Sequence, residues 1–484
     1  MIPKKRTRFN WWTPSIPLLE SHPSFSSIFS GSTLLLTIYR TFRLSYLLLT
    51  TPLHLLCIFL SFPPFSLDFS SIFDSHWTPT QKLVYPFLRR IIWALADVGD
   101  PNVLTRSTEE GYTPWWAWAL EEFTVRIGRR ERVEVTKERG VEMPKEVWEK
   151  GWIRQDSLVV DKTRRGIQLE PVNLFWFELK RKKRSRKDGF RAKDEGERCV
   201  MYLFGGGFVC GSPGEGSRCF KMARETGLRV VGVNYRRATS PDRAFPAALQ
   251  DVLTCYFHLT LELGYKDVIL AGDSAGGGLA LNVLQYLTGT LYPTLTTREQ
   301  NHFVLPSGLV LFSPWCDLTL DSFPDEQNRT DIILPSICEN SVRAYLGEDD
   351  SRNDEKNQNR SKTNQQDLAT HPWLSPSLPS SLPSLRTITT PYTPSRSSTS
   401  PSPSTSSQTP GREPLRIFLT LGTSELFYSS LLSLAQNLES LDQKAVQVET
   451  MIGKGEVHAF PLVPTWVSPE ATKAWERLRV WFEG

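Results

Sequence analysis

The residues best suited to chemistry lie in the motif GDSAGG at 272–277. Its first five residues fit the pattern G-x-S-x-G, in which a serine occupies a tight turn between a strand and a helix. The run DVILAG (267–272) predicts that strand, and AGGGLALNVLQYL (275–287) predicts that helix. The pattern therefore predicts Ser274 as a nucleophile, lifted clear of a sheet and backed by the amino end of a helix.

A second candidate element is the glycine run at 205–207, which follows the predicted strand CVMYLF (199–204). Glycines let backbone N–H groups approach a substrate oxygen closely, as an oxyanion hole requires. A flexible turn is the simpler alternative. The position of the run ahead of the GDSAGG motif favours a loop that stabilises developing negative charge.

A serine nucleophile needs a base and an acid that orients the base. His458 follows the last predicted strand and is favoured by elimination, because the other histidines lie in the N-terminal region, a linker, a helix or an irregular stretch: His22, His54, His76, His258, His302 and His371. Glu425 follows the predicted strand 416–422, where an acid can emerge at the carboxyl edge of a sheet. An ordinary loop carboxylate is the alternative for Glu425. The competing acids are Asp273, beside the serine, and Asp317, after an earlier strand.

Elements that could position these residues alternate along the chain from residue 155 onward. Helical stretches separate short apolar runs at 174–179, 199–204, 228–235, 267–272, 308–313, 416–422 and 446–453. This alternation predicts an α/β fold with a mainly parallel central sheet and helices on both faces.

Taken in order, these motifs resemble the hormone-sensitive-lipase branch of the α/β-hydrolases, also called the α/β-hydrolase-3 group. The matching segments are FGGGFVCGS (204–212), NYR (234–236), FPAALQDV (245–252), GDSAGGGLA (272–280), SPWCDLT (313–319), LGTSEL (421–426) and VHAF (457–460). The resemblance covers about residues 155–484 and implies the roles of nucleophile for Ser274, acid for Glu425 and base for His458.

The same resemblance assigns the oxyanion hole to the amides of Gly206, Gly207 and Ala275. It also implies that N-terminal helices form a cap over the site. The family usually has a histidine before the three glycines, and its hydrogen bonds brace the loop. This chain has Phe204 there, which cannot make those bonds.

The N-terminal region predicts a membrane anchor. Residues 44–67 contain no Asp, Glu, Lys or Arg, and such a length can cross a hydrocarbon layer of about 30 Å as a helix. Pro52 and His54 leave an interfacial or a buried helix as alternatives. Basic residues precede the run, which places the N-terminus in the cytosol and the rest in a lumen: Lys4, Lys5, Arg6, Arg8, Arg40 and Arg43. An anchor ahead of such a domain is similar to fungal steryl acetyl hydrolases, which implies the endoplasmic-reticulum membrane.

The predicted organisation has three parts. Residues 1–74 form the basic N-terminus and anchor, 75–154 a helical cap, and 155–484 the catalytic domain. Within the last part, about residues 349–411 are rich first in Asn, Asp and Gln and then in Ser and Pro. This composition predicts a mostly disordered insert.

The composition excludes several classes of protein. The 484 residues include 56 Lys and Arg and 52 Asp and Glu, a balance that argues against a nucleic-acid partner. With 40% hydrophobic residues the chain can bury a sizeable core. The seven cysteines form no C-x-x-C pair, which gives no support to a zinc site.

These observations predict a serine carboxylic-ester hydrolase that needs no metal or organic cofactor. The expected substrate is a lipophilic short-acyl ester, with an acetylated sterol as one candidate. An amidase or lactonase would use the same triad. A non-catalytic binder of small molecules on this fold is the alternative from another functional class.

Overall fold

The structure is a computed structural model of the 484-residue chain. It describes residues 33–61, 74–95, 105–108, 111–114, 133–152, 168–180, 190–192, 194, 196–214, 218–323, 330–347, 367–392 and 412–483. Both ends of the insert expected at about 349–411, residues 349–366 and 393–411, lie outside these residues.

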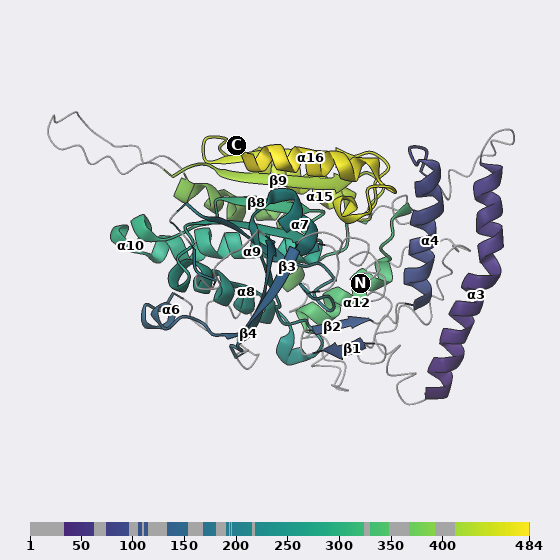
Figure 1. The fold of residues 1–484 in the computed structure, drawn as a ribbon, viewed down its shortest axis with the longest axis horizontal. Coiled ribbons are helices and arrows are strands. Elements are labelled where there is room, and N and C mark those ends of the chain that lie inside the picture. The colour runs from purple at the N-terminus through teal and green to yellow at the C-terminus, as the bar shows by residue number, and fades with distance from the viewer. Residues whose placement is uncertain are drawn as a thin grey trace.

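An eight-stranded sheet organises the molecule (Figure 1). Its order is β10-β9-β8-β7-β5-β6-β4-β3. The six strands from β10 to β6 in this order run parallel to one another, whereas β4 pairs antiparallel with both β6 and β3. The strands are β3 (Val133–Val141), β4 (Val172–Leu179), β5 (Arg198–Leu203), β6 (Arg229–Val233), β7 (Asp267–Asp273), β8 (Gly308–Phe312), β9 (Leu415–Gly422) and β10 (Val446–Gly453). A separate hairpin pairs β1 (Thr105–Thr108) with β2 (Gly111–Pro114). The predicted mainly parallel α/β sheet is confirmed.

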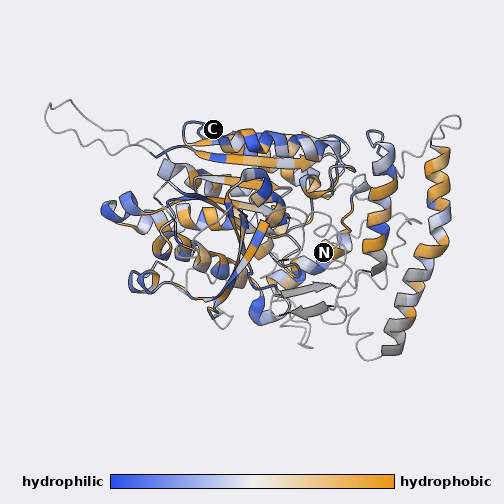
Figure 2. Cartoon of the chain, in the orientation of Figure 1, coloured by the Kyte–Doolittle hydropathy of each residue, from blue (hydrophilic) through white to orange (hydrophobic). Residues whose placement is uncertain are grey.

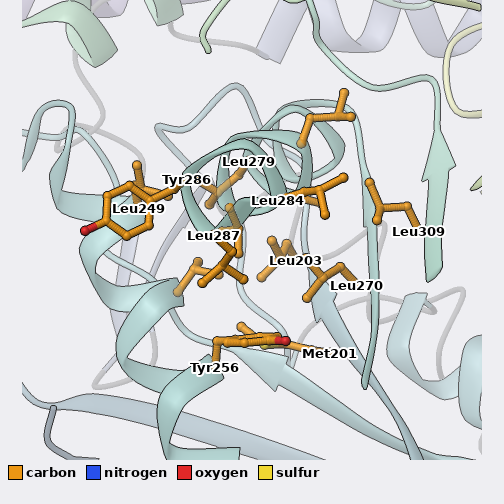
Figure 3. Packing of buried hydrophobic residues seen from close by; sticks show 14 of the residues in the cluster. Met201, Leu203, Leu249, Tyr256, Leu270, Leu279, Leu284, Tyr286, Leu287 and Leu309 are labelled. Atoms are coloured by element: carbon orange, nitrogen blue, oxygen red, sulfur yellow. The ribbon is translucent and has the colours of Figure 1, made fainter. Parts of the chain in front are cut away.

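The central strands are continuous apolar runs because both faces of the sheet are buried. Along β7, Val268 and Leu270 join one core cluster, whereas Ile269 and Ala271 join the other, as the two-residue period of a strand requires. Figure 3 shows the first cluster, where Leu270 and Leu203 of the sheet pack near Leu279 and Leu284.

Helices cover both faces. Residues of α8 (Ala247–Phe257), α9 (Ala275–Gln285) and α15 (Tyr428–Glu439) enter the first core, and residues of α7 (Arg218–Thr226) and α16 (Pro469–Glu483) enter the second. The remaining α-helices of the described chain are α3 (Thr33–Leu60), α4 (Pro79–Leu95), α6 (Lys145–Glu149), α10 (Thr297–His302), α12 (Pro335–Leu346) and α14 (Leu382–Arg386).

The segment 75–154, which was expected to form a helical cap, is not wholly helical. This segment contains α4 and α6, but it also supplies β3, which pairs antiparallel with β4 at the edge of the sheet. The sheet thus begins before residue 155. The sequence VEVTKERGV gave no sign of this strand because its side chains are mostly exposed and polar, as an edge strand permits.

The two N-terminal helices α3 and α4 lie side by side at one end of the molecule (Figure 1). Helix α3 includes Arg40, Arg43 and Pro52, so it begins well before the uncharged run and ends at Leu60. Within the described residues, no helix combines the length and apolarity needed to cross a bilayer. The predicted spanning anchor over 44–67, and the lumenal orientation that depended on it, are therefore not supported.

Part of the expected disordered insert is folded. Residues 367–392 form short helical turns whose Leu385, Ile388 and Tyr392 are buried in the main core. Serines of this described part are hydrogen-bonded within the fold: the hydroxyl of Ser377 donates to the carbonyl of Cys316 at 2.8 Å, and that of Ser381 donates to the carbonyl of Ser375 at 2.8 Å. Prediction from composition failed here because the stabilising contacts come from segments distant in the sequence.

Ile388→Ala tests whether this segment belongs to the core. Because Ile388 is fully buried, the substitution should lower the free energy of unfolding by about 2–5 kcal/mol. Chemical denaturation measures the change, with the exposed neighbour Thr390→Ala as control, for which we expect a change within about 0.5 kcal/mol. Equal effects of the two substitutions would show that the segment does not contribute to the core.

Candidate active site

Ser274 occupies a strained turn between β7 and α9. Its φ of 52° and ψ of −125° lie outside the regions that residues other than glycine prefer. The flanking glycines are required by space: a Cβ on Gly272 would lie 2.6 Å from the carbonyl of Gly276, and one on Gly276 would lie 2.1 Å from the oxygen of Leu203. The predicted strand–turn–helix context of the motif is confirmed.

The turn is tied to the neighbouring strand β8. The N–H of Ser274 donates to the carbonyl of Phe312 at 3.0 Å, and the carbonyl of Ser274 accepts from the N–H of Trp315 at 2.8 Å. The residue after Phe312 is Ser313, so the loop at the end of β8 runs directly beside the serine. The ends of β7 and β8 are thereby fixed with respect to each other.

Glu425 and His458 form a buried pair. Nδ1 of His458 lies 2.9 Å from Oε2 of Glu425, with side-chain exposures of 5% and 0%. The other carboxylate oxygen, Oε1, accepts from the N–H of Gly422 at 2.6 Å and from the hydroxyl of Ser313 at 3.0 Å. The structure thus brings together the acid and base that the sequence predicted.

Nε2 of His458 is buried and has no hydrogen-bond partner among the described residues. A buried polar nitrogen without a hydrogen-bond partner lowers the stability of the fold. Because Nδ1 of His458 is held by Glu425, Nε2 is the nitrogen that can exchange a proton. The arrangement leaves one imidazole nitrogen oriented by Glu425 and the other available for chemistry.

The electrostatics of the pair follow from burial and from nearby charges. Burial raises the pKa of Glu425, and the hydrogen bond with His458 offsets this only in part. Burial by itself lowers the pKa of His458, but the hydrogen bond and charge of Glu425, together with the charges of Asp331 and Asp273, outweigh it. The pKa of His458 therefore lies above its ordinary value of 6.5.

Ser313 connects three loops, and sequence reasoning gave it no role. Besides donating to Glu425, its Oγ accepts from the N–H of Ala459, next to the histidine, at 3.0 Å. Its own N–H donates to the carbonyl of Thr420 on β9 at 3.0 Å. Its position at the start of the SPWCDLT motif was the only signal that could have identified it.

The glycine loop at 205–207 is held by Asp273, the residue before Ser274. Oδ1 of Asp273 accepts from the N–H of Gly205 at 3.1 Å and from the hydroxyl of Tyr202 at 3.0 Å, while Oδ2 accepts from Arg218 at 3.1 Å. In the described chain the N–H groups of Gly206 and Gly207 have no acceptor. Asp273 therefore orients the loop, which leaves two donors open.

Phe204 occupies the position at which the family that the sequence resembles usually has a histidine. Its ring holds the same loop by stacking. Its ring lies parallel to that of Tyr235, with centroids 4.2 Å apart, and the Arg237 guanidinium lies 5.0 Å from its centroid. The hydroxyl of Tyr235 donates to the Phe204 carbonyl at 2.6 Å, and Arg237 donates to the carbonyl of Gly211 at 2.8 Å. Aromatic and cation–π contacts thus fix the loop in place of imidazole hydrogen bonds.

A series of aromatic rings runs from the glycine loop to the histidine. Phe208 stacks on Tyr345 with centroids 3.7 Å apart and packs against Trp315 at 5.9 Å. Trp315 in turn stacks on Phe427 at 5.2 Å, and Phe427 meets the His458 ring edge-on at 4.9 Å. The side of His458 that meets Phe427 is therefore apolar.

Two other carboxylates near the site have different partners. Asp317 accepts from Thr319 and Ser322 and closes its own loop, so it is not the acid that holds the histidine. Asp331 accepts main-chain N–H groups of His458 and Leu426 rather than the imidazole. Asp331 lies outside every motif that the sequence revealed.

The comparisons with known proteins agree with this architecture. Residues 200–378 match the family model described as alpha/beta hydrolase fold. An acetyl-hydrolase of Streptomyces hygroscopicus is 34% identical over 167 residues, which are 33% of this chain and 50% of that protein. An esterase of Acinetobacter venetianus is 29% identical over 187 residues, which are 38% of this chain and 55% of that protein. The chain spans about half the length of the curated relatives that it matches.

Among solved structures, an esterase of Pyrobaculum calidifontis superposes with a TM-score of 0.50 at 19% sequence identity, covering 82% of this chain and 97% of that one. At this identity the likeness bears on the fold alone. Together with the eight-stranded sheet and the turn at Ser274, the match over residues 200–378 supports an α/β-hydrolase fold for this part of the chain.

Proposed function

We propose that this protein is a serine carboxylic-ester hydrolase with Ser274 as nucleophile, His458 as base and Glu425 as the orienting acid. The observation that carries the proposal is the buried hydrogen bond between His458 and Glu425, with Nε2 of the imidazole left without a partner in the described part of the chain. Ser274 Oγ attacks the ester carbonyl while the imidazole takes its proton, and Glu425 stabilises the imidazolium. The imidazolium then protonates the departing alcohol, and water releases the acyl group from the serine.

The oxyanion that forms on the carbonyl needs hydrogen-bond donors fixed in advance. The N–H groups of Gly206 and Gly207 have no acceptor among described residues, and the N–H of Ala275 is one of the first in α9, which have none within the helix. These three amides are our candidates for the oxyanion hole.

For the substrate we propose a short-acyl ester of a lipophilic alcohol, with an acetylated sterol as one candidate. The apolar rings from Phe208 to Phe427 support an apolar alcohol portion. The acetyl-hydrolase name of the Streptomyces relative supports a short acyl group. Amides and lactones pass through the same tetrahedral intermediate, so the substrate screen includes them.

We also propose that α3 lies against a lipid surface. Figure 2 shows many apolar residues along the coloured part of the helix, and its exposed apolar side chains are Ile38, Phe42, Leu48, Leu49, Leu53, Leu55, Leu56 and Phe59. The basic residues at or before Arg43 favour anionic headgroups. The proposed attachment is peripheral and corresponds to the interfacial alternative to the predicted spanning anchor.

Labelling by a fluorophosphonate probe tests the nucleophile. Wild-type protein should be labelled and should hydrolyse p-nitrophenyl acetate, because the probe reacts with an activated serine. Ser274→Ala and His458→Ala should not be labelled, and their kcat for hydrolysis should fall by about 10³-fold or more. Their thermal unfolding should be unchanged. A folded wild-type protein that is not labelled, or that binds lipophilic esters without cleaving them, would favour the non-catalytic binder.

The pH dependence of hydrolysis tests the base. A protonated imidazole cannot accept the serine proton, and the pKa of His458 is raised, so kcat/KM should fall as pH decreases with a midpoint above 6.5. Glu425→Gln should move that midpoint to lower pH and reduce kcat by about 10³–10⁴-fold. The exposed Glu439→Gln is the control and should change neither value. A midpoint below 6.5 in the wild-type protein would contradict the assignment.

Vesicle flotation tests the lipid surface. The full chain should bind phosphatidylcholine vesicles that contain phosphatidylserine more strongly than vesicles of phosphatidylcholine alone. The double substitution Leu48→Glu with Leu49→Glu should reduce binding about tenfold or more, since the two side chains are 72% and 76% exposed. Trp466→Glu with Val480→Glu, at similarly exposed positions elsewhere, is the control. Equal binding by both double variants would overturn the proposal.

A further inference from the structure

We propose that Asp331 is a positioning residue of this site: a second buried carboxylate that holds the acid loop and the histidine loop together and is itself fixed by Arg89 of the N-terminal helix α4. The inference rests on the proposed hydrolase function and adds to it a residue outside the triad. It also gives α4 a role in the geometry of catalysis.

The carboxylate of Asp331 accepts main-chain hydrogen bonds from both loops. Its side chain is fully buried, and Oδ1 accepts from the N–H of His458 at 3.0 Å while Oδ2 accepts from the N–H of Leu426 at 2.7 Å. Leu426 directly follows Glu425. One carboxylate therefore joins the backbone of the base to the backbone beside the acid, and the distance between the two side chains depends on it.

Arg89 fixes the segment that carries Asp331. Its guanidinium donates from Nη1 to the carbonyls of Asp331 and Ile333, and its side chain is 3% exposed. Thr330 in the same segment donates through its hydroxyl to the carbonyl of Ser424 at 3.1 Å. The segment at 330–333 is therefore tied both to α4 and to the acid loop.

Helix α4 is anchored on the histidine side as well. Gln81 donates to Oε1 of Glu456 at 2.9 Å, and the hydroxyl of Tyr85 donates to Oε2 at 2.6 Å. Just before the helix, the indole of Trp77 donates to the carbonyl of Gly455. The N-terminal segment thus contacts both the segment at 330–333 and the loop that precedes His458.

The charges around His458 make its pKa a measurable sign of the role proposed for Asp331. The groups that face the imidazole are Glu425 after β9, Asp331 before α12 and Asp273 at the end of β7, while Arg89 of α4 faces Asp331. Removing the charge of Asp331 lowers the pKa of His458. Arg89 carries the opposite charge and acts on Asp331, so we expect removal of its charge to shift the pKa of His458 in the opposite direction. A residue that only stabilised the fold would change neither.

The experiment measures kcat and KM for p-nitrophenyl acetate against pH in wild-type protein, Asp331→Asn and Arg89→Met. In Asp331→Asn an amide N–H₂ replaces one acceptor, so we expect kcat to fall about 10- to 100-fold with KM little changed, and the acid limb to move to lower pH. In Arg89→Met we expect a smaller fall in kcat and an acid limb at higher pH. Asp317→Asn is the matched control, a buried carboxylate that also accepts a backbone N–H, and it should leave the acid limb in place.

Opposite movements of the acid limb in the two variants support the inference. An unmoved limb in both, or a loss of kcat no larger than in Asp317→Asn, would overturn it. If Asp331→Asn does not fold by circular dichroism, Arg89→Met decides alone: a raised limb supports the inference and an unchanged profile overturns it. An inactive wild-type protein would instead count against the proposed hydrolase, which keeps the two failures distinguishable.

Discussion

The structure around the site depends on one constraint: Glu425 and His458 are removed from water, so each of their polar atoms needs a partner fixed by the fold. An uncompensated buried carboxylate is strongly unfavourable. Oε1 of Glu425 is satisfied by Gly422 and Ser313, and Oε2 by the imidazole. The atom left over is Nε2 of His458, and it is the one that the proposed chemistry uses.

The parallel sheet meets this constraint by bringing loops that are distant in sequence to one edge. The ends of the adjacent strands β7, β8, β9 and β10 are followed by Ser274, Ser313, Glu425 and His458, three of which are the proposed nucleophile, acid and base. Ser313 then joins Glu425 to the backbone beside His458, and the ring of Phe427 closes the apolar side of the imidazole. Regular backbone pairing thus sets the coarse positions, and a few side-chain hydrogen bonds set the final ones.

The candidate catalytic residues were more predictable from the sequence than the residues that hold them in place. Ser274 was identifiable because a strained turn excludes a side chain at Gly272 and Gly276, so the constraint is local and leaves a motif. Asp331 and Arg89 left none, since their role arises only when 330–333, 455–458 and α4 come together in three dimensions. The buried turn around Ile388 was missed for the same reason, because its partners lie far away along the chain.

Crystallography of the protein phosphonylated by a fluorophosphonate tests the proposed nucleophile and oxyanion hole together. We expect a phosphorus atom on Oγ of Ser274, with its oxyanion-like oxygen within hydrogen-bond distance of the N–H groups of Gly206, Gly207 and Ala275. We also expect that Nε2 of His458 faces the adduct while Nδ1 stays on Glu425. An adduct on another residue, or an oxygen that points away from the glycine loop, would contradict the account.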